Sequence, residues 1–263
     1  MNPVGDSWSP EQYHRFRDER SQPYFDLLAL VERDVDRPRV ADLGCGTGEL
    51  TAEAHTALAA RATVGIDNSP AMLGQAARLD VPGLTFAEGD IGEFSDPDGF
   101  DVIISNAALH WVPDHERVLA RWRDALADGG QLAVQMPTNA DHPSHVTARA
   151  VAAEEPFLSA FDGDPPEDPV LRVMPPEDYA VLLDRLGFGR QHVRVQVYPA
   201  RLASSADVVE WVKGTNLTRF ERRLSPEHYA EFLDRYRTRL LAVLGDQRPY
   251  FYAFKRVLFW ARR

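Results

Sequence analysis

The sequence predicts an α/β fold, in which a parallel sheet with helices on both faces is followed by a mainly helical C-terminal part. Short apolar segments alternate with helical segments between residues 39 and 136, a pattern typical of parallel strands joined by right-handed crossovers. A glycine-rich turn at residues 44–48 follows the first of these segments. Hydrophobic residues make up 44% of the chain and charged residues 26%, which excludes disorder and coiled coil for the chain as a whole.

Five short segments are predicted to form the strands of this sheet. The run Val102-Ile103-Ile104 is apolar without interruption, as in strands that are buried on both faces. Asp128-Gly129-Gly130 is predicted to be a turn before the last of the five. The expected strands are Arg39–Leu43, Ala62–Asp67, Leu84–Glu88, Phe100–Ser105 and Gln131–Met136.

Helices are predicted before the sheet and between its strands. Ser9-Pro10-Glu11 combines an N-cap residue, a proline at the first helical position and an acidic first turn, and predicts a helix as far as about Glu19. Asp114 is the expected N-cap of a later helix. The other expected helices run from Pro23 to before Pro38, from Glu49 to about Ala59, from Pro70 to Leu79 and from Asp114 to about Leu126.

Beyond Pro137 the alternation of strands and helices stops. The segment Asp162–Pro176 is acidic and contains five prolines, so a loop or lid is predicted there. Further helices are expected at His142–Glu155, Pro176–Leu186, Ala206–Lys213 and Pro226–Leu244, and further strands at Gln191–Tyr198 and Arg256–Ala261. We therefore expect an N-terminal helical lid (1–30), a core (31–140) and a helical cap that also supplies the last strands of the sheet (141–263).

Composition excludes several classes of function. The chain has 29 Lys and Arg against 40 Asp and Glu, a net charge of −11, which disfavours nucleic acid as a partner. Cys45 is the single cysteine, so an intrachain disulfide and a cysteine-based zinc site are excluded, and no metal is expected. No apolar run approaches the roughly 20 residues that span a bilayer. We expect a cytoplasmic monomer that acts on a small molecule, not on a membrane or a nucleic acid.

The glycine-rich turn is the strongest functional signal. Glycines let the backbone approach a ligand closely, and the amides of a helix N-terminus favour acceptor groups. The spacing at Gly44, Gly46 and Gly48 is G-x-G-x-G, whereas the dinucleotide fingerprint requires G-x-G-x-x-G and residue 49 is Glu. An acidic turn also faces a pyrophosphate poorly. A nicotinamide-dependent oxidoreductase is therefore disfavoured.

The segment Asp42-Leu43-Gly44-Cys45-Gly46-Thr47-Gly48 resembles the first motif of the class I S-adenosylmethionine (SAM)-dependent methyltransferases. The resemblance implies a Rossmann-like sheet with SAM as cofactor. Asp67 would accept both ribose hydroxyls, because a carboxylate has two acceptor oxygens, and Asp90 stands where the family places an acid for the adenine. The implied cofactor-binding residues are Asp42, Gly44, Cys45, Gly46, Thr47, Gly48, Asp67, Asn68, Met72, Asp90, Ile91, Asn106 and Ala107.

Other segments resemble one family within this class, the trans-aconitate 2-methyltransferases. They are the spaced N-terminal pattern from Trp8 to Pro23, Asn106–His115 and Ala133–Pro137. The resemblance extends over nearly the whole chain, although Asp162–Pro176 has no clear counterpart. It implies formation of a monomethyl ester on a tricarboxylate, with S-adenosylhomocysteine (SAH) as coproduct.

A carboxylate acceptor is already ionised at neutral pH, so its methylation requires proximity and alignment but no general base. Arginines suit such an acceptor, because a guanidinium fork matches a carboxylate. We predict His110 and Trp111 as catalytic residues, since they directly follow the fourth strand. The predicted substrate-binding residues are Tyr13, Arg20, His110, Trp111, Tyr198 and Arg219, and Gln12 and Phe16 are expected to close on the cofactor.

Two alternatives stay open at this point. In the first alternative, the protein is a methyltransferase whose acceptor is a phenol, a lipid or a carbon nucleophile, with His110 as the base. In the second, the chain is a SAM-binding module without catalytic activity. Each candidate residue also has a structural reading: Arg20 and Arg219 as surface residues, Trp111 as part of the core, and Tyr13 and Phe16 as the apolar face of a helix.

Overall fold

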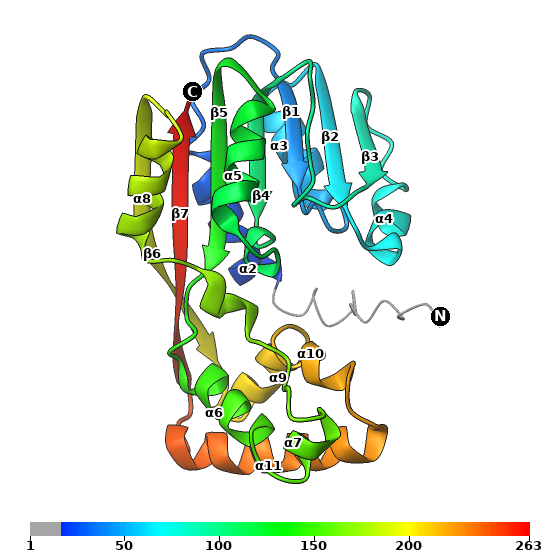
Figure 1. Cartoon of the computed structure of the whole chain (residues 1–263), viewed down its shortest axis with the longest axis vertical. Helices are drawn as coiled ribbons and strands as arrows, with labels where there is room; N and C mark the ends of the chain where they lie inside the picture. The colour runs from blue at the N-terminus through cyan, green and yellow to red at the C-terminus, as the bar shows by residue number, and fades with distance from the viewer. Residues whose placement is uncertain (1–16) are drawn as a thin grey trace. The chain divides into compact units, whose positions relative to one another are not determined.

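The strand segments predicted from the sequence form a seven-stranded sheet with the order β3-β2-β1-β4-β5-β7-β6 (Figure 1). This computed structural model describes the backbone of residues 17–263 and the side chains of residues 22–263. The strands are β1 Arg39–Leu43, β2 Ala62–Asp67, β3 Leu84–Glu88, β4 Phe100–Asn106, β5 Leu126–Pro137, β6 Arg190–Leu202 and β7 Tyr250–Arg262.

Strands β1 to β5 are parallel, as the sequence predicts. β1 pairs with β2 on one side and with β4 on the other. The chain adds β2 and β3 on one side of β1 and then crosses to add β4 and β5 on the other, so the strand order reverses between β1 and β4. β7 joins β5 in antiparallel orientation, with Leu132 opposite Ala261. In open α/β sheets, ligands bind outside the carboxyl ends of the strands at such a switch point. A ligand site is therefore expected at the carboxyl ends of β1 and β4.

The chain divides into two compact units. The sheet unit comprises Asp18–Pro137, Arg172–Gln196 and Lys255–Arg263, and the helical unit comprises the described residues of Thr138–Leu171 and Val197–Phe254.

In the sheet unit, α5 covers one face of the sheet and α3 the other (Figure 1). Trp122 of α5 is fully buried, and its indole N–H donates to the carbonyl oxygen of Ile91 across 2.8 Å, which satisfies the one polar atom of a large core side chain. The helices of this unit are α2 Arg17–Leu28, α3 Glu49–Ala57, α4 Pro70–Ala76, η1 Leu109–Trp111, α5 His115–Asp124 and α8 Pro176–Arg185.

The helical unit has its own apolar core. The rings of Phe220 and Phe232 lie 4.7 Å apart and are both fully buried. Ser225 caps α11 by accepting the N–H of His228. The helices of this unit are α6 Pro143–Ala152, α7 Phe157–Ala160, α9 Asp207–Lys213, α10 Thr218–Glu221 and α11 Pro226–Leu244; the short turn η2, Pro169–Arg172, begins in it.

The predicted fold class, an α/β sheet with helices on both faces, is confirmed, but two predicted boundaries are wrong. A helix from Pro23 to before Pro38 was expected, whereas α2 runs through Pro23 and ends at Leu28. Asp128-Gly129-Gly130 is not a separate turn, because these residues lie within β5. Phe100 pairs with Leu126 and Val102 with Gln131, so the extra residues of β5 form a bulge.

Smaller differences affect the ends of elements. α4 ends at Ala76 instead of Leu79, and β6 and β7 are longer than predicted. The four-residue helices α7 and α10 carry too few residues to show a helical period and were not predicted. The expected helix from Ser9 to Glu19 lies largely outside the described residues. Within the described residues, no helix combines the length and the apolar character needed to cross a membrane.

Candidate active site

The loop between β1 and α3 has a backbone that requires glycine. Gly44, Gly46 and Gly48 all have positive φ angles, of 85°, 56° and 76°, a region that L-residues rarely adopt. A Cβ on Gly44 would lie 2.1 Å from the Cβ of Ala108, whereas a Cβ on Gly46 would meet no atom of the described residues within 4 Å. Gly44 therefore permits close packing, and the side of the loop at Gly46 is open.

Asp67 ties this loop to the end of β2. Its Oδ2 accepts the backbone N–H of Gly46 at 2.8 Å, and its Oδ1 accepts the backbone N–H of Ser69 at 2.9 Å. The side chain is half-buried. Each carboxylate oxygen accepts more than one hydrogen bond, so both oxygens retain acceptor capacity toward a pair of neighbouring hydroxyls.

Asp42 occupies a different environment from Asp67. It is 3% exposed, and the hydroxyl of Thr51 donates to its Oδ2 at 2.6 Å. Burial raises the pKa of Asp42 to about 6, with the Thr51 hydrogen bond opposing the rise and the charge of Asp67 adding to it. Asp42, a predicted cofactor-binding residue, is thus hydrogen-bonded to Thr51 of α3. Burial also raises the pKa of the Cys45 thiol, so Cys45 stays protonated and is no nucleophile.

The residues after β2 and β3 lie at the same edge of the sheet as the glycine loop. Asn68 is exposed, and Met72 is buried in α4. Asp90 is exposed, and its Oδ1 accepts the backbone N–H of Gly92 at 2.8 Å, while Ile91 next to it is buried. This edge therefore combines an acid and an amide on the surface with apolar side chains beneath.

A chain of polar side chains joins the end of β4 to β5 and β7. The side-chain amide of Gln135 donates to Asn106 Oδ1, and the guanidinium of Arg256 donates to Gln135 Oε1 at 2.7 Å. Arg256 is 7% exposed, and it pairs with Pro137 at the end of β5. Neither Gln135 nor Arg256 is among the candidate residues predicted from the sequence. The available signal was a glutamine inside an otherwise apolar strand.

His110 and Trp111 lie in η1, directly after β4. Their rings are 5.1 Å apart, His110 is 5% exposed and Trp111 is 37% exposed. Arg172 donates to the carbonyl oxygen of Trp111 at 3.0 Å. Ala107 before them has a positive φ of 53°, so the chain turns sharply as it leaves the strand. The two predicted catalytic side chains thus adjoin the Asn106 end of β4.

The remaining predicted residues belong to other elements of the chain. Tyr198 and Arg219 belong to the helical unit and are both buried, and Arg219 lies 3.5 Å from Asp168. Arg20 lies in α2, but its side chain is outside the described part of the chain, as are Gln12, Tyr13 and Phe16 altogether. Among the described residues, no group of three or more His, Cys, Asp or Glu side chains is arranged to hold a metal ion.

The arrangement in the sheet unit fits SAM. The open backbone at Gly46 leaves room for a ligand beside the loop, and Asp67 matches a ribose diol. The acidic side chains Asp67 and Asp90 are suited to a cofactor that carries hydroxyls, an amine and a sulfonium cation and no phosphate. Phosphate would instead require a basic or uncharged edge.

Comparison with known proteins supports the same assignment. The profile described as "Methyltransferase domain" matches residues 40–130. The trans-aconitate 2-methyltransferase of Deinococcus radiodurans is 45% identical over 260 residues, which cover 98% of each chain. The enzyme of the same name from Methylobacterium radiotolerans is 42% identical over 87% of each chain. The crystal structure of the YcgJ protein of Bacillus subtilis is similar, with a TM-score of 0.61 and 14% identity, covering 92% of this chain and 98% of that one.

The structural match shows the Rossmann-like fold, and the sequence matches show the family that the motifs predict. Because the identity extends over nearly the full length of both chains, the protein belongs to the trans-aconitate 2-methyltransferase family and is a SAM-dependent methyltransferase.

Proposed function

We propose that this protein transfers the methyl group of SAM to one carboxylate of trans-aconitate, forming a monomethyl ester and SAH. The observation that carries the proposal is the polar strand-end arrangement around Asp67 and Gly46, in a chain that is 45% identical to a relative named for this reaction. SAM supplies a methyl group activated by its sulfonium when it is bound.

In this proposal the sheet unit binds the cofactor. Asp67 accepts the ribose hydroxyls, Asp90 accepts the adenine amino group, and Asn106 holds the amino-acid end. The remaining proposed cofactor residues are Gln12, Phe16, Asp42, Gly44, Cys45, Gly46, Thr47, Gly48, Asn68, Met72, Ile91 and Ala107. Support comes from the positions of the described members of this set at the carboxyl ends of β1, β2, β3 and β4.

The acceptor carboxylate carries its own negative charge at neutral pH, so His110 and Trp111 act on its position and hydration, not on its proton. The low exposure of His110 supports this, because a buried ring excludes water from the reacting atoms. Tyr13, Arg20, Tyr198 and Arg219 complete the proposed set of acceptor-binding residues. No metal ion takes part.

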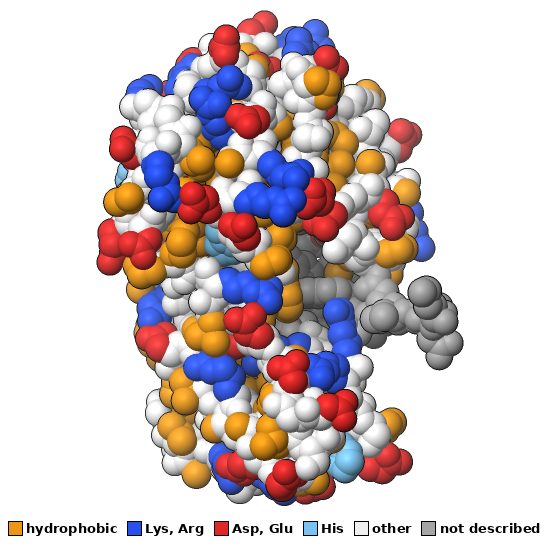
Figure 2. Space-filling view, viewed as in Figure 1, with side chains coloured by type: hydrophobic (Ala, Val, Ile, Leu, Met, Phe, Trp, Pro, Cys, Tyr) orange, Lys and Arg blue, Asp and Glu red, His pale blue; other side chains and the backbone are white. Residues whose placement is uncertain are grey.

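We further propose residues 31–140 as the SAM-binding part, residues 1–30 as a lid, and residues 141–263 as the part that selects the acceptor. The partner is the small acid, and the protein works as a monomer in the cytoplasm without nucleic acid or membrane. On the face seen in Figure 2, Lys and Arg are interspersed with Asp and Glu and do not form a basic track, as the net charge of −11 leads one to expect.

Transfer of a labelled methyl group from SAM to trans-aconitate, citrate, cis-aconitate and isocitrate tests the proposal. We expect rapid labelling of trans-aconitate and release of the label by base, because esters hydrolyse in base. Labelling of none of these acids, with SAM binding intact, would refute the acceptor assignment. It would favour another small acceptor with His110 as base, or a binding module without catalytic activity.

A further inference from the structure

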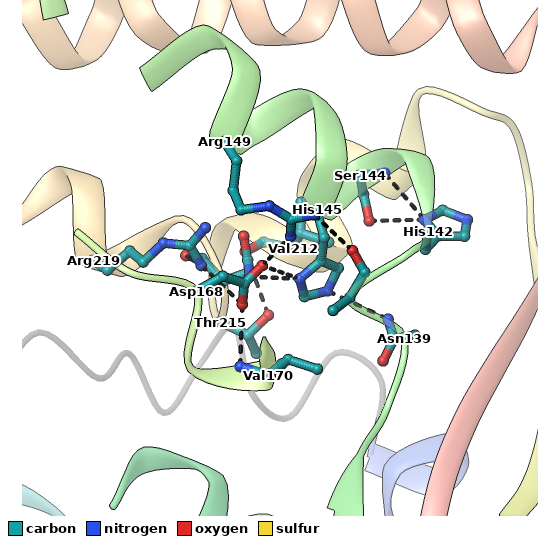
Figure 3. A network of polar contacts seen from close by, with 12 residues as sticks. Asn139, His142, Ser144, His145, Arg149, Asp168, Val170, Val212, Thr215 and Arg219 are labelled. Carbon is teal, nitrogen blue, oxygen red and sulfur yellow. Dashed lines mark hydrogen bonds and ion pairs between the residues drawn. The ribbon is translucent and has the colours of Figure 1, made fainter. Parts of the chain in front are cut away.

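A buried ionic cluster lies within the helical unit. Asp168 is fully buried. It accepts hydrogen bonds from His145 Nδ1 at 2.8 Å and from Arg149 Nη1 at 2.9 Å, and Arg219 Nη1 lies 3.5 Å away. Figure 3 shows these three side chains directed toward the Asp168 carboxylate.

The cluster has more positive than negative charge. Burial alone would raise the pKa of Asp168, but the hydrogen bond and charge of His145 and the charge of Arg219 outweigh it and hold that pKa well below its usual range. Asp168 is therefore ionised. Burial lowers the pKa of Arg219 to about 10, and the charge of Arg149 lowers it while that of Asp168 raises it. Two protonated guanidiniums thus share one carboxylate, so the buried charge of Arg219 is only partly balanced by Asp168.

One edge of Arg219 lacks a partner. Its Nη1 donates to the carbonyl oxygen of Asn216 at 3.1 Å. Its Nε and Nη2 are buried and have no hydrogen-bond partner among the described residues. The residue as a whole is 8% exposed. Buried guanidinium donors are normally bonded in native structures, so this edge indicates a group that the described protein atoms do not supply.

The unbonded pair has the shape of a carboxylate receptor. On a guanidinium, the Nε–H and Nη2–H bonds point the same way and form a side-on fork, which binds the two oxygens of one carboxylate in parallel. The ring of Phe220 lies 4.4 Å from the guanidinium carbon, and Asp168 and Asn216 hold the opposite Nη1. The fork is thus fixed in orientation before any ligand binds, which favours affinity.

We infer that the Nε/Nη2 edge of Arg219 is a binding site for one carboxylate of a small polycarboxylate ligand. The identity of that ligand as the acceptor acid rests on the proposed function. A purely structural role would use both sides of the guanidinium, as Arg223 does in the same unit. Arg223 donates through Nη1 to Asp164 and through Nη2 to Phe161, both backbone carbonyls.

The test measures the Kd of trans-aconitate by titration calorimetry on the full chain saturated with SAH. The variants are Arg219→Gln, Arg219→Lys and, as the matched control, Arg223→Gln. Arg219→Gln should raise the Kd about 10- to 100-fold, because it removes a bidentate charged contact. Arg219→Lys keeps the charge but loses the fork and should raise it less. Arg223→Gln should leave it unchanged, and SAM should bind all variants alike.

The same titration with fumarate, a dicarboxylate, identifies the contact independently of folding. Fumarate has one carboxylate fewer than trans-aconitate. If Arg219 binds the carboxylate that fumarate lacks, the ratio of the Kd of Arg219→Lys to the Kd of wild type should be smaller for fumarate than for trans-aconitate. An unchanged Kd for trans-aconitate in Arg219→Lys, or in an Arg219→Gln variant that still binds SAM, overturns the inference. So does a wild type that binds neither acid.

The outcomes separate this inference from the proposed function. If wild type binds trans-aconitate through Arg219 but transfers no methyl group to it, the proposed reaction fails and the carboxylate site stands. If wild type methylates trans-aconitate and the Arg219 variants keep its KM, the reaction stands and the carboxylate site fails.

Discussion

The carboxylate of Asp67 accepts the backbone N–H of Gly46 across 2.8 Å, although the two residues are 21 positions apart in the chain. This hydrogen bond joins the loop after β1 to the end of β2 and orients the carboxylate before a ligand arrives. The residue proposed to read the ribose of SAM is therefore also a residue that shapes the loop beside it.

Replacing Asp67 should weaken SAM binding more than it weakens the fold. Asp67→Ala removes the proposed acceptor of two ribose hydroxyls and releases the Gly46 N–H, so the Kd of SAM should rise at least about 10-fold. Titration calorimetry measures this change. Asp80→Asn, at an exposed aspartate after α4, is the control and should bind SAM like wild type. If the Kd of SAM for Asp67→Ala lies within threefold of the wild-type value, Asp67 does not bind the cofactor.

Two glycines of the same loop should respond differently to alanine. Gly44→Ala adds a Cβ at 2.1 Å from Ala108 Cβ, so overpacking of about 1–3 kcal/mol adds to the strain of a positive φ and should lower the free energy of unfolding. The Cβ of Gly46→Ala meets no atom within 4 Å in the part of the chain that the structure describes. This variant should retain more stability but lose SAM affinity, because its Cβ enters the open space beside the loop.

Urea unfolding and SAM titration of both variants distinguish these effects. Gly187→Ala, after α8, has a similar φ of 82° and only an ordinary contact with Arg123, so it isolates the strain of the backbone. If Gly44→Ala and Gly187→Ala lower the free energy of unfolding equally, Ala108 moves aside to accommodate the new Cβ, and the overpacking argument is wrong.

Asp42 should make the stability of the SAM-free protein depend on pH. Its folded pKa of about 6 lies above the ordinary 3.8, so the folded state binds the proton more tightly. The resulting stabilisation is fully present below about pH 4 and is lost as the pH rises through 6, a change on the order of 3 kcal/mol. Asp42→Asn has no proton to lose at this position.

The measurement is urea unfolding of wild type and Asp42→Asn from pH 4 to pH 8. The difference between their free energies of unfolding should shift in favour of Asp42→Asn between pH 4 and pH 6.5 and then stay level. A difference that is constant over the whole range would mean that Asp42 ionises in the folded protein as it does in water.

His110 should affect the rate of methyl transfer without setting its pH dependence. With a carboxylate acceptor, kcat/KM should be level between pH 6.5 and 8.5, and His110→Ala should lower it by up to about 100-fold through misplacement of the acceptor. His192→Ala, at an exposed histidine of β6, is the control. A profile that rises through neutrality in wild type and becomes level in His110→Ala would instead identify His110 as a general base.

The elements of the sheet could be predicted from local patterns because their causes are local. Apolar runs such as Val102-Ile103-Ile104, the glycines of residues 44–48 and the N-cap Asp114 each specify their own structure, and the structure confirms them. Predictions were wrong where a distant contact overrides the local signal. The glycines at 129 and 130 indicate a turn, yet Leu126 before them and Gln131 after them pair with β4, and the glycines form a bulge within β5.

The fold class, the order of the strand-end motifs and the family could therefore be predicted from the sequence. The pairing of the charged side chains, in contrast, became known only from the three-dimensional structure. The structure places Asp42 against Thr51, Arg256 against Gln135 and Asp168 between Arg149 and Arg219. The physical reason is that hydrophobic period and turn chemistry act between neighbours in the chain, whereas a hydrogen bond or an ion pair depends on which distant elements meet and on how much water remains between them.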